Sequence, residues 1–440
     1  MKALRQLLIL ALLLSALPSG FAQSALDESG RQMIAPVPLS VLDEQARQRV
    51  GAKARVVLAE ESADVFKGIE TFELPESGRV PNYLRALATN PNAVRPFASL
   101  LKAFIYGGTI QPETKLIMAL RIAQMHGSGY VATHLQRLLG AGGDGQALLE
   151  CFRSNKLSDL KPADLIAVRY AELLTSDIHG VSDAEFQKAR GYYNDSQIVE
   201  LTFTVCFFNY FTRLCEGLAL PVEAWALDAA IKPRIPAFSR SDLAVARVAL
   251  ISDDEMNATS AAMAAAKESA SQQGGLGLGI ANSQRAMLRV PALAQAWRSF
   301  GAAVRPSMKI SREIQLHVSF AVSMANGCRY CTLHQVLGLR RLGVDPAKLV
   351  AMQKSDGALT KRELAAVRFA RKLTRDPRSV TDADYETLRA EFGEQGALDV
   401  LMQTCNFNFM NRFTDGLRLP SEDEAIRVYR EVYGTDFKKK

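Results

Sequence analysis

The chain has 440 residues, of which 48% are apolar, 22% charged and 8% aromatic, and its formal net charge is +7. This length predicts two or three domains, and the apolar fraction excludes a chain that is disordered over most of its length. Part of the positive charge lies in an N-terminal leader and in three C-terminal lysines, so the remaining excess is mild and scattered. We therefore expect no nucleic acid among its partners.

Residues 1–22 have the pattern of a secretory signal peptide. Lys2 and Arg5 precede an apolar run at residues 7–16, and small residues suited to cleavage close the segment. The apolar run is shorter than the roughly 20 residues that a transmembrane helix needs. No other apolar stretch is long enough, so we expect no stable membrane span after cleavage. The leader predicts an exported bacterial protein, either periplasmic or secreted.

The two halves of the chain repeat each other at a displacement of 200 positions, which changes to 199 after one gap. The matching pairs include Asn82 with Asn282, Tyr130 with Tyr330, His134 with His334, Cys206 with Cys405, and Arg213 with Arg412. This repetition predicts an internal duplication. We expect a signal peptide at 1–22, an N-terminal extension at 23–79, a first repeat at 80–232, a connecting segment at 233–281, and a second repeat at 282–440.

Both repeats have the pattern of helical domains. Long apolar stretches without strand alternation start near Glu113 and Glu313, and further stretches follow in each repeat. The longest of them, at 197–218 and 397–417, close the two repeats. No convincing run of alternating β-branched residues is present, so the predicted fold class is all-α.

Six cysteines in a chain of this length are too few for a disulfide scaffold. Cys328 and Cys331 are close enough to form a disulfide or a cycling dithiol in an oxidising compartment. The others are expected to be mostly buried, small apolar residues; they are Cys151, Cys206, Cys215 and Cys405.

The chemistry is expected at the start of a helix in the second repeat. Asn326 and Gly327 end one predicted helix, and Cys328 begins the next. A thiol in the first turn lies at the positive end of the helix dipole, which lowers its pKa. Cys331 follows one turn later, and His334 follows at the same spacing. Such a group suits hydroperoxide reduction, in which one thiolate becomes a sulfenic acid and the other thiol condenses with it.

This segment resembles a known family. The run Ser319-Phe-Ala-Val-Ser, followed by Asn-Gly-Cys-x-x-Cys, is similar to the alkylhydroperoxidase D-like branch of the carboxymuconolactone decarboxylase superfamily. The closing run that begins Cys405-Asn-Phe-Asn also resembles that superfamily. The resemblance extends over residues 80–222 and 282–421. It implies two tandem helical domains that assemble as a homo-oligomer.

The resemblance also implies thiol-dependent reduction of a hydroperoxide. Cys331 would be the peroxidatic cysteine and Cys328 the resolving one, with a thiol reductant as the second partner and no metal or other cofactor. The first repeat has Ser128 and Val131 at the two cysteine positions. We therefore expect redox chemistry in the second repeat alone. The shared residues, such as His134, are expected to shape helix packing or a pocket.

The sequence departs from the family pattern at the proton-relay positions. The family's histidine falls four residues after the second cysteine, where this chain has Gln335, and its glutamate falls twelve residues before the first, where this chain has Leu316. Glu313 lies one turn before Leu316, and His317 follows Glu313 at i+4. We therefore predict Glu313, His317 and His334 as the candidate relay residues.

Other interpretations of the cysteine pair stay open. The pair is also compatible with a permanent structural disulfide in a non-catalytic helical oligomer that binds a small ligand or partner. A metal site formed by Cys328, Cys331, His334 and His317 has suitable ligand types. Haem attachment is excluded, because no histidine directly follows the second cysteine.

Overall fold

The computed structural model describes residues 24–26, 32–69, 79–233 and 281–437. The predicted signal peptide and most of the predicted connecting segment lie outside these residues. The described part contains seventeen α-helices and one antiparallel pair of short strands, β1 (Ser24–Leu26) and β2 (Gln32–Ile34). The all-α prediction is therefore confirmed.

The described part of the first half has nine α-helices, and those from α3 onward follow one another through short connections. They are α2 (Leu39–Gln48), α3 (Asn82–Leu87), α4 (Pro91–Tyr106), α5 (Pro112–His126), α6 (Gly129–Ala141), α7 (Gly145–Arg153), α8 (Pro162–Ser176), α9 (Asp183–Arg190) and α10 (Asp195–Gly217).

The second half has a similar order of helices. They are α13 (Asn282–Met287), α14 (Pro291–Val304), α15 (Arg312–Asn326), α16 (Arg329–Arg341), α17 (Pro346–Lys354), α18 (Lys361–Arg375), α19 (Asp382–Gly416) and α20 (Asp423–Tyr433). Helix α19 contains a break at Gly393, whose φ of 71° and ψ of 177° are not helical. The predicted helix at 397–417 is thus the second part of a longer, kinked element.

A glycine in the left-handed conformation ends the helix before each candidate site. Gly127 follows α5 with φ 64°, and Gly327 follows α15 with φ 71°. The next residues, Ser128 and Cys328, are the N-caps of α6 and α16, and each side chain accepts a hydrogen bond from the backbone N–H three residues later. Only glycine adopts this conformation without strain, so it lets one helix stop and the next begin at once. The predicted helix boundary at Gly327 and Cys328 is confirmed.

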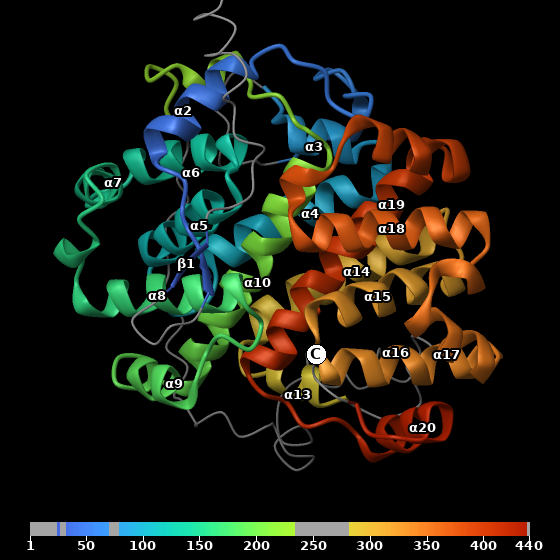
Figure 1. The fold of residues 1–440 in the computed structure, drawn as a ribbon. Coiled ribbons are helices and arrows are strands. Elements are labelled where there is room, and N and C mark those ends of the chain that lie inside the picture. The colour runs from blue at the N-terminus through green and yellow to red at the C-terminus, as the bar shows by residue number, and fades with distance from the viewer. Residues whose placement is uncertain (1–23, 27–31, 70–78, 234–280, 438–440) are drawn as a thin grey trace, which may run out of the picture.

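The two halves pack through long apolar helices. Helix α10 lies against α19, and α4 lies against α14. In Figure 1 helices α5 to α9 of the first half lie on the left and α15 to α18 of the second half lie on the right, with α10 near the middle. Aromatic rings meet across this boundary: Phe203 and Phe413 have centroids 4.8 Å apart. Residues of both halves therefore share one continuous apolar core.

Helix α10 is long and apolar enough to cross a membrane, judged by length and composition. No such stretch was expected beyond the leader, and α10 is an exception to that expectation. Its apolar stretch is 100% buried within the protein. The apolar side chains of α10 are enclosed by the rest of the protein, which is the environment of a core helix.

Candidate functional site

Cys328 and Cys331 are both free thiols, as are the other four cysteines of the chain. The Cys331 backbone N–H donates to the Cys328 sulfur at 3.2 Å. The Thr414 hydroxyl oxygen, on α19, lies 3.4 Å from the Cys328 sulfur and 3.3 Å from the Cys331 sulfur. That hydroxyl donates to the Met410 carbonyl, so its oxygen can accept from both thiols. One turn of helix and one threonine thus hold the two sulfurs together.

Burial determines the ionisation of Cys328. The residue is fully buried, and this burial raises the pKa of its thiol well above the usual value. The hydrogen bond with Cys331 and the negative charge of Asp415 raise this pKa further. The prediction that the helix N-terminus lowers the pKa of Cys328 is therefore wrong, because desolvation of the sulfur outweighs the helix dipole. Cys328 is a neutral thiol near pH 7.

A pocket of about 290 Å³ lies beside the cysteine pair. Tyr330 and Leu419 line this pocket and also belong to the apolar cluster that contains both cysteines. The remaining lining residues are polar or charged: His179, Arg329, Asp415, Arg418 and Ser421. His179 comes from the loop between α8 and α9, so the first half of the chain contributes to the wall of a pocket in the second half.

His334 is held in a separate cluster with Tyr330 and Glu422. Its Nδ1 lies 2.6 Å from the Tyr330 carbonyl oxygen, and its Nε2 lies 2.6 Å from a Glu422 carboxylate oxygen. The Tyr330 hydroxyl donates to the other Glu422 oxygen at 3.0 Å. Burial alone would raise the pKa of Glu422, but the contact with His334 keeps it below the usual value. Both ring nitrogens of His334 are therefore engaged by groups other than the sulfurs.

The first half contains the same arrangement without cysteines. His134 Nε2 lies 3.1 Å from a Glu223 carboxylate oxygen, and the Tyr130 hydroxyl donates to the other oxygen at 3.0 Å. Sequence reasoning missed Glu223 and Glu422, although they too are 199 positions apart. The cluster thus forms whether or not a thiol is present.

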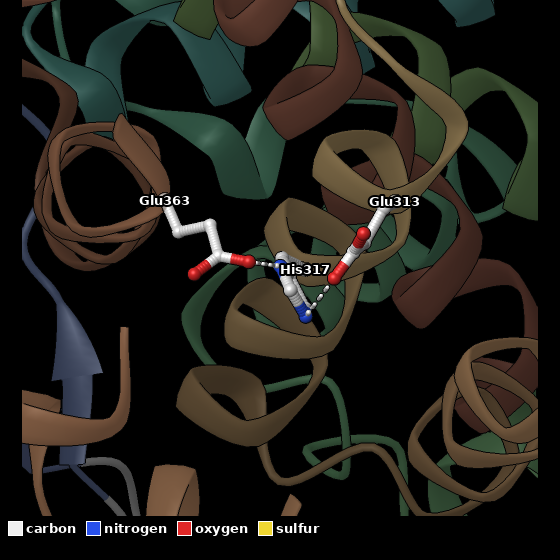
Figure 2. A group of neighbouring side chains, drawn as sticks. All are labelled: Glu313, His317 and Glu363. Atoms are coloured by element: carbon white, nitrogen blue, oxygen red, sulfur yellow. Dashed lines mark ion pairs between the residues drawn. The ribbon is translucent and has the colours of Figure 1, made fainter. Parts of the chain in front are cut away.

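Glu313 and His317 lie in a third group, drawn in Figure 2. His317 is fully buried on α15, with its Nδ1 3.2 Å from Glu363 on α18 and its Nε2 3.9 Å from Glu313 one turn earlier. Lys348 on α17 contacts both carboxylates, at 2.7 Å from Glu363 and 3.4 Å from Glu313. Burial lowers the pKa of His317, and the charge of Lys348 lowers it further. Glu363 and Lys348 were not predicted.

This third group has the ligand types of a metal site. One ligand atom from each of Glu313, His317 and Glu363 lies within 4.8 Å of the others. The Lys348 ammonium, however, already contacts both carboxylates and compensates one of their two negative charges. The arrangement is therefore a charge network around a buried histidine, in which Lys348 already acts as a cationic partner.

The metal set considered from the sequence, which combined both cysteines with His317 and His334, is not assembled. His317 precedes the end of α15 at Asn326 by nine residues, which is about 14 Å along the helix axis at 1.5 Å per residue. The cysteines follow that end. The predicted site residues thus fall into three groups: the cysteine pair, His334 with Glu422, and Glu313 with His317. Their catalytic roles stay predictions.

A protein-family model matches part of the second half of the chain. Residues 291–372 match the model of the Carboxymuconolactone decarboxylase family. No curated protein matches the sequence. Among solved structures, a variant of the debrominase Bmp8 in complex with 2,3,4-tribromopyrrole has 21% identity and a TM-score of 0.30, over 34% of this chain and 82% of that one. The matched family segment includes both cysteines, and the chain therefore contains a carboxymuconolactone decarboxylase family domain.

Proposed function

We propose that the protein is an exported, thiol-dependent oxidoreductase that reduces hydroperoxides through Cys331 and Cys328. The observation that carries this proposal is the pair of reduced sulfurs, one helical turn apart, that share the Thr414 hydroxyl beside a pocket. The family match of the surrounding segment supports a thiol-based enzymatic role. A thiol compound of the exported compartment would supply the reducing electrons.

The two cysteines would divide the reaction between them. Cys331 retains 3% exposure whereas Cys328 has none, so we assign the peroxidatic role to Cys331, as the family resemblance also implies. Its thiolate attacks the hydroperoxide, the O–O bond breaks, and Cys331 becomes a sulfenic acid while an alcohol leaves. Cys328 then attacks the Cys331 sulfur, which forms the disulfide and releases water. The thiol reductant restores both thiols by exchange.

We also infer that the chain consists of two tandem domains that arose by duplication. Beyond the sequence displacement, equivalent hydrogen bonds support this inference. The Asn209 side-chain amide donates to the Thr175 hydroxyl at 2.9 Å, and the Asn408 amide donates to the Thr374 hydroxyl at 2.9 Å. Under this proposal the first domain has lost its thiols and the second carries the chemistry.

Substitution of each cysteine tests the proposed function. Cys331→Ser should abolish hydroperoxide consumption, because a serine hydroxyl is not ionised at neutral pH. Cys328→Ser should allow one turnover and leave a sulfenic acid that a dimedone-type reagent traps. The measurement is an anaerobic thiol titration after addition of hydroperoxide to the reduced mature protein.

Cys151→Ser is the matched control, because Cys151 is half-buried on α7 and lies outside the site. It should behave as the wild type. If all three variants consume hydroperoxide at the wild-type rate, the dithiol mechanism is wrong. A cysteine pair whose disulfide has a reduction potential below about −300 mV, in a protein that consumes no hydroperoxide, would instead favour a structural disulfide in a non-catalytic helical protein.

A further inference from the structure

We propose that His179, from the first half of the chain, and Asp415, from the second, form the proton-transfer pair of the cysteine site. This inference rests on the proposed function and adds to it. It makes the site a composite one, in which the half without redox cysteines supplies the group that moves the proton.

The predicted relay residues leave this task open. Leu316 and Gln335 occupy the positions where the resemblance expects acid–base groups, and neither side chain titrates. His334 has both ring nitrogens in contact with Tyr330 and Glu422. His317 lies in the group with Glu363. The contacts of His334 and His317 are thus with groups other than the two sulfurs, so another residue is the better candidate to carry the proton from the attacking thiol to the leaving alkoxide.

The pocket wall contains one imidazole, the side-chain type most often used for proton transfer in neutral solution. The ionisable groups that line it are His179, Arg329, Tyr330, Asp415 and Arg418. A guanidinium does not serve as a proton donor or acceptor in proteins, and burial raises the pKa of the Tyr330 hydroxyl far above neutrality. A carboxylate such as Asp415 is ordinarily ionised at pH 7. An imidazole ordinarily exchanges its proton near pH 6.5, so His179 is the group suited to this reaction.

The orientation of His179 fits this role. Its Nδ1 lies 3.9 Å from an Asp415 carboxylate oxygen. On the other side of the ring, Nε2 faces Gly327, where a built Cβ would lie 3.5 Å away. Gly327 directly precedes Cys328, and Asp415 directly follows Thr414, which contacts both sulfurs. The histidine ring thus lies between a carboxylate and the backbone that carries the first thiol.

The loop that carries His179 is held in place. The His179 backbone N–H donates to the Asp177 side chain at 3.0 Å, and the neighbouring Ile178 packs in the same apolar cluster as both cysteines. The His179 side chain is 24% exposed, so the ring is open to the pocket and to solvent. A fixed backbone with a partly exposed ring suits a group that must exchange protons repeatedly.

The equivalent position in the other half provides a comparison. Arg378 lies 199 positions after His179, and its guanidinium packs against Gly127 as His179 packs against Gly327. Glu216 lies 199 positions before Asp415 and accepts a hydrogen bond from the Ser128 hydroxyl at 2.6 Å. The site without redox cysteines is therefore faced by an arginine of the second half, and the site with them is faced by a histidine of the first half.

The proton balance of the reaction is simple. Neutral His179 takes the proton of the Cys331 thiol and leaves a thiolate, with Asp415 stabilising the imidazolium. The thiolate attacks the hydroperoxide, the S–O bond forms and the O–O bond breaks. The departing alkoxide takes the proton from His179 and leaves as the alcohol. Cys331 is oxidised by two electrons, the hydroperoxide is reduced by two, and His179 returns to its neutral form.

His179→Gln tests this assignment with two measurements on the full mature chain. The first is the rate of Cys331 alkylation by iodoacetamide as a function of pH, which needs no peroxide. The wild type should show a pH-dependent rise in this rate that the variant lacks. The second is kcat/KM for tert-butyl hydroperoxide, which should fall by about 10²-fold in keeping with the loss of one acid–base group. In His179→Ala, added imidazole should restore part of the rate.

Arg378→Gln is the matched control and should leave both measurements at wild-type values. If His179→Gln keeps the wild-type pH profile and rate while Cys331→Ser is inactive, His179 has no role in proton transfer and the proposed function stands. If Cys331→Ser consumes hydroperoxide as the wild type does, the proposed function itself fails. A changed alkylation profile without hydroperoxide turnover would support the His179 assignment and contradict the peroxide substrate.

Discussion

Equivalent buried positions in the two halves carry different charges. In the first half, Lys115 and Glu200 form a fully buried ion pair at 2.5 Å. In the second half the corresponding residues are Gln315 and Asp399, so the carboxylate lacks a lysine partner at that position. Burial raises the pKa of Asp399 to about 6, although the backbone N–H of Lys309 donates to it at 2.6 Å. The second half therefore holds a carboxylate that is costly to ionise.

Asp399→Asn should make the protein more stable in neutral and alkaline solution. The folded state binds the Asp399 proton more tightly than the unfolded state, whose pKa is 3.8, so wild-type stability falls as the pH rises from about 4 to about 6. Asparagine stays neutral, and the gain at pH 8 should be up to about 3 kcal/mol, at 1.36 kcal/mol per pKa unit. Urea unfolding at pH 8 and pH 4.5 measures it.

The gain should shrink to about 1 kcal/mol at pH 4.5 and vanish only below about pH 3.8, where the aspartate is protonated in both the folded and the unfolded state. Asp144→Asn is the control, because Asp144 is exposed and pairs only with Lys161 at the surface. A gain of the same size at both pH values would mean that ionisation of Asp399 is not its cause.

At the scale of the elements, features that depend on spacing along one helix were predicted correctly more often than features that depend on packing between helices. The helix boundary at Gly327, the shared face of the cysteines and the proximity of Glu313 to His317 all follow from spacing along one helix, and the structure confirms them. The predicted low pKa of Cys328 was wrong because its degree of burial depends on the packing of α16 against α19.

His179 could not have been identified from sequence. It lies 149 positions before Cys328, and its place in the pocket depends on how the two halves pack. Glu422 differs, because the displacement of 199 links it to Glu223 and the repeat could have revealed it. The part of the site that lies along one helix was thus predictable, and the part that crosses between helices was not.

The glycines before α6 and α16 should respond differently to alanine. Both have positive φ, so either substitution introduces backbone strain of about 1–2 kcal/mol. At Gly327 the new methyl group would meet His179 at an ordinary contact distance of 3.5 Å. At Gly127 it would lie 2.6 Å from the Arg378 guanidinium, which must move. Thermal unfolding should therefore show a larger loss of stability for Gly127→Ala than for Gly327→Ala.

The double variant Gly127→Ala with Arg378→Ala is the control, because it lacks the side chain that would clash. Compared with Arg378→Ala alone, it should lose only the stability that the backbone strain at position 127 costs. Equal losses for the two single variants would show that the Arg378 side chain moves aside freely.

At the scale of the whole molecule, the two halves depend on each other for their core. Phe409 of α19 stacks on Trp297 at 3.9 Å and meets Phe104 and Phe203 of the first half. Helix α10 is equally surrounded. Separation of the halves would expose these aromatic faces to water, and apolar patches of that kind drive association.

A chain reduced to residues 281–440 should therefore aggregate or pair with itself. Size-exclusion chromatography with light scattering measures this, and the mature full-length chain is the reference, for which we expect a homo-oligomer. A monomeric, folded and soluble fragment would show that the contact between α10 and α19 is not needed for the fold.

His179 packs against Gly327, and Arg378 packs against Gly127. These two contacts limit which insertions and deletions the surrounding loops can tolerate. A deletion that shortens the first of these loops alters a wall of the pocket beside cysteines encoded almost 150 codons downstream. Under the proposed function, natural selection on the cysteine site would then also act on the half that lacks the cysteine pair. Among descendants of this gene, loop lengths around positions 179 and 378 are expected to be inherited together with the glycines on which they rest.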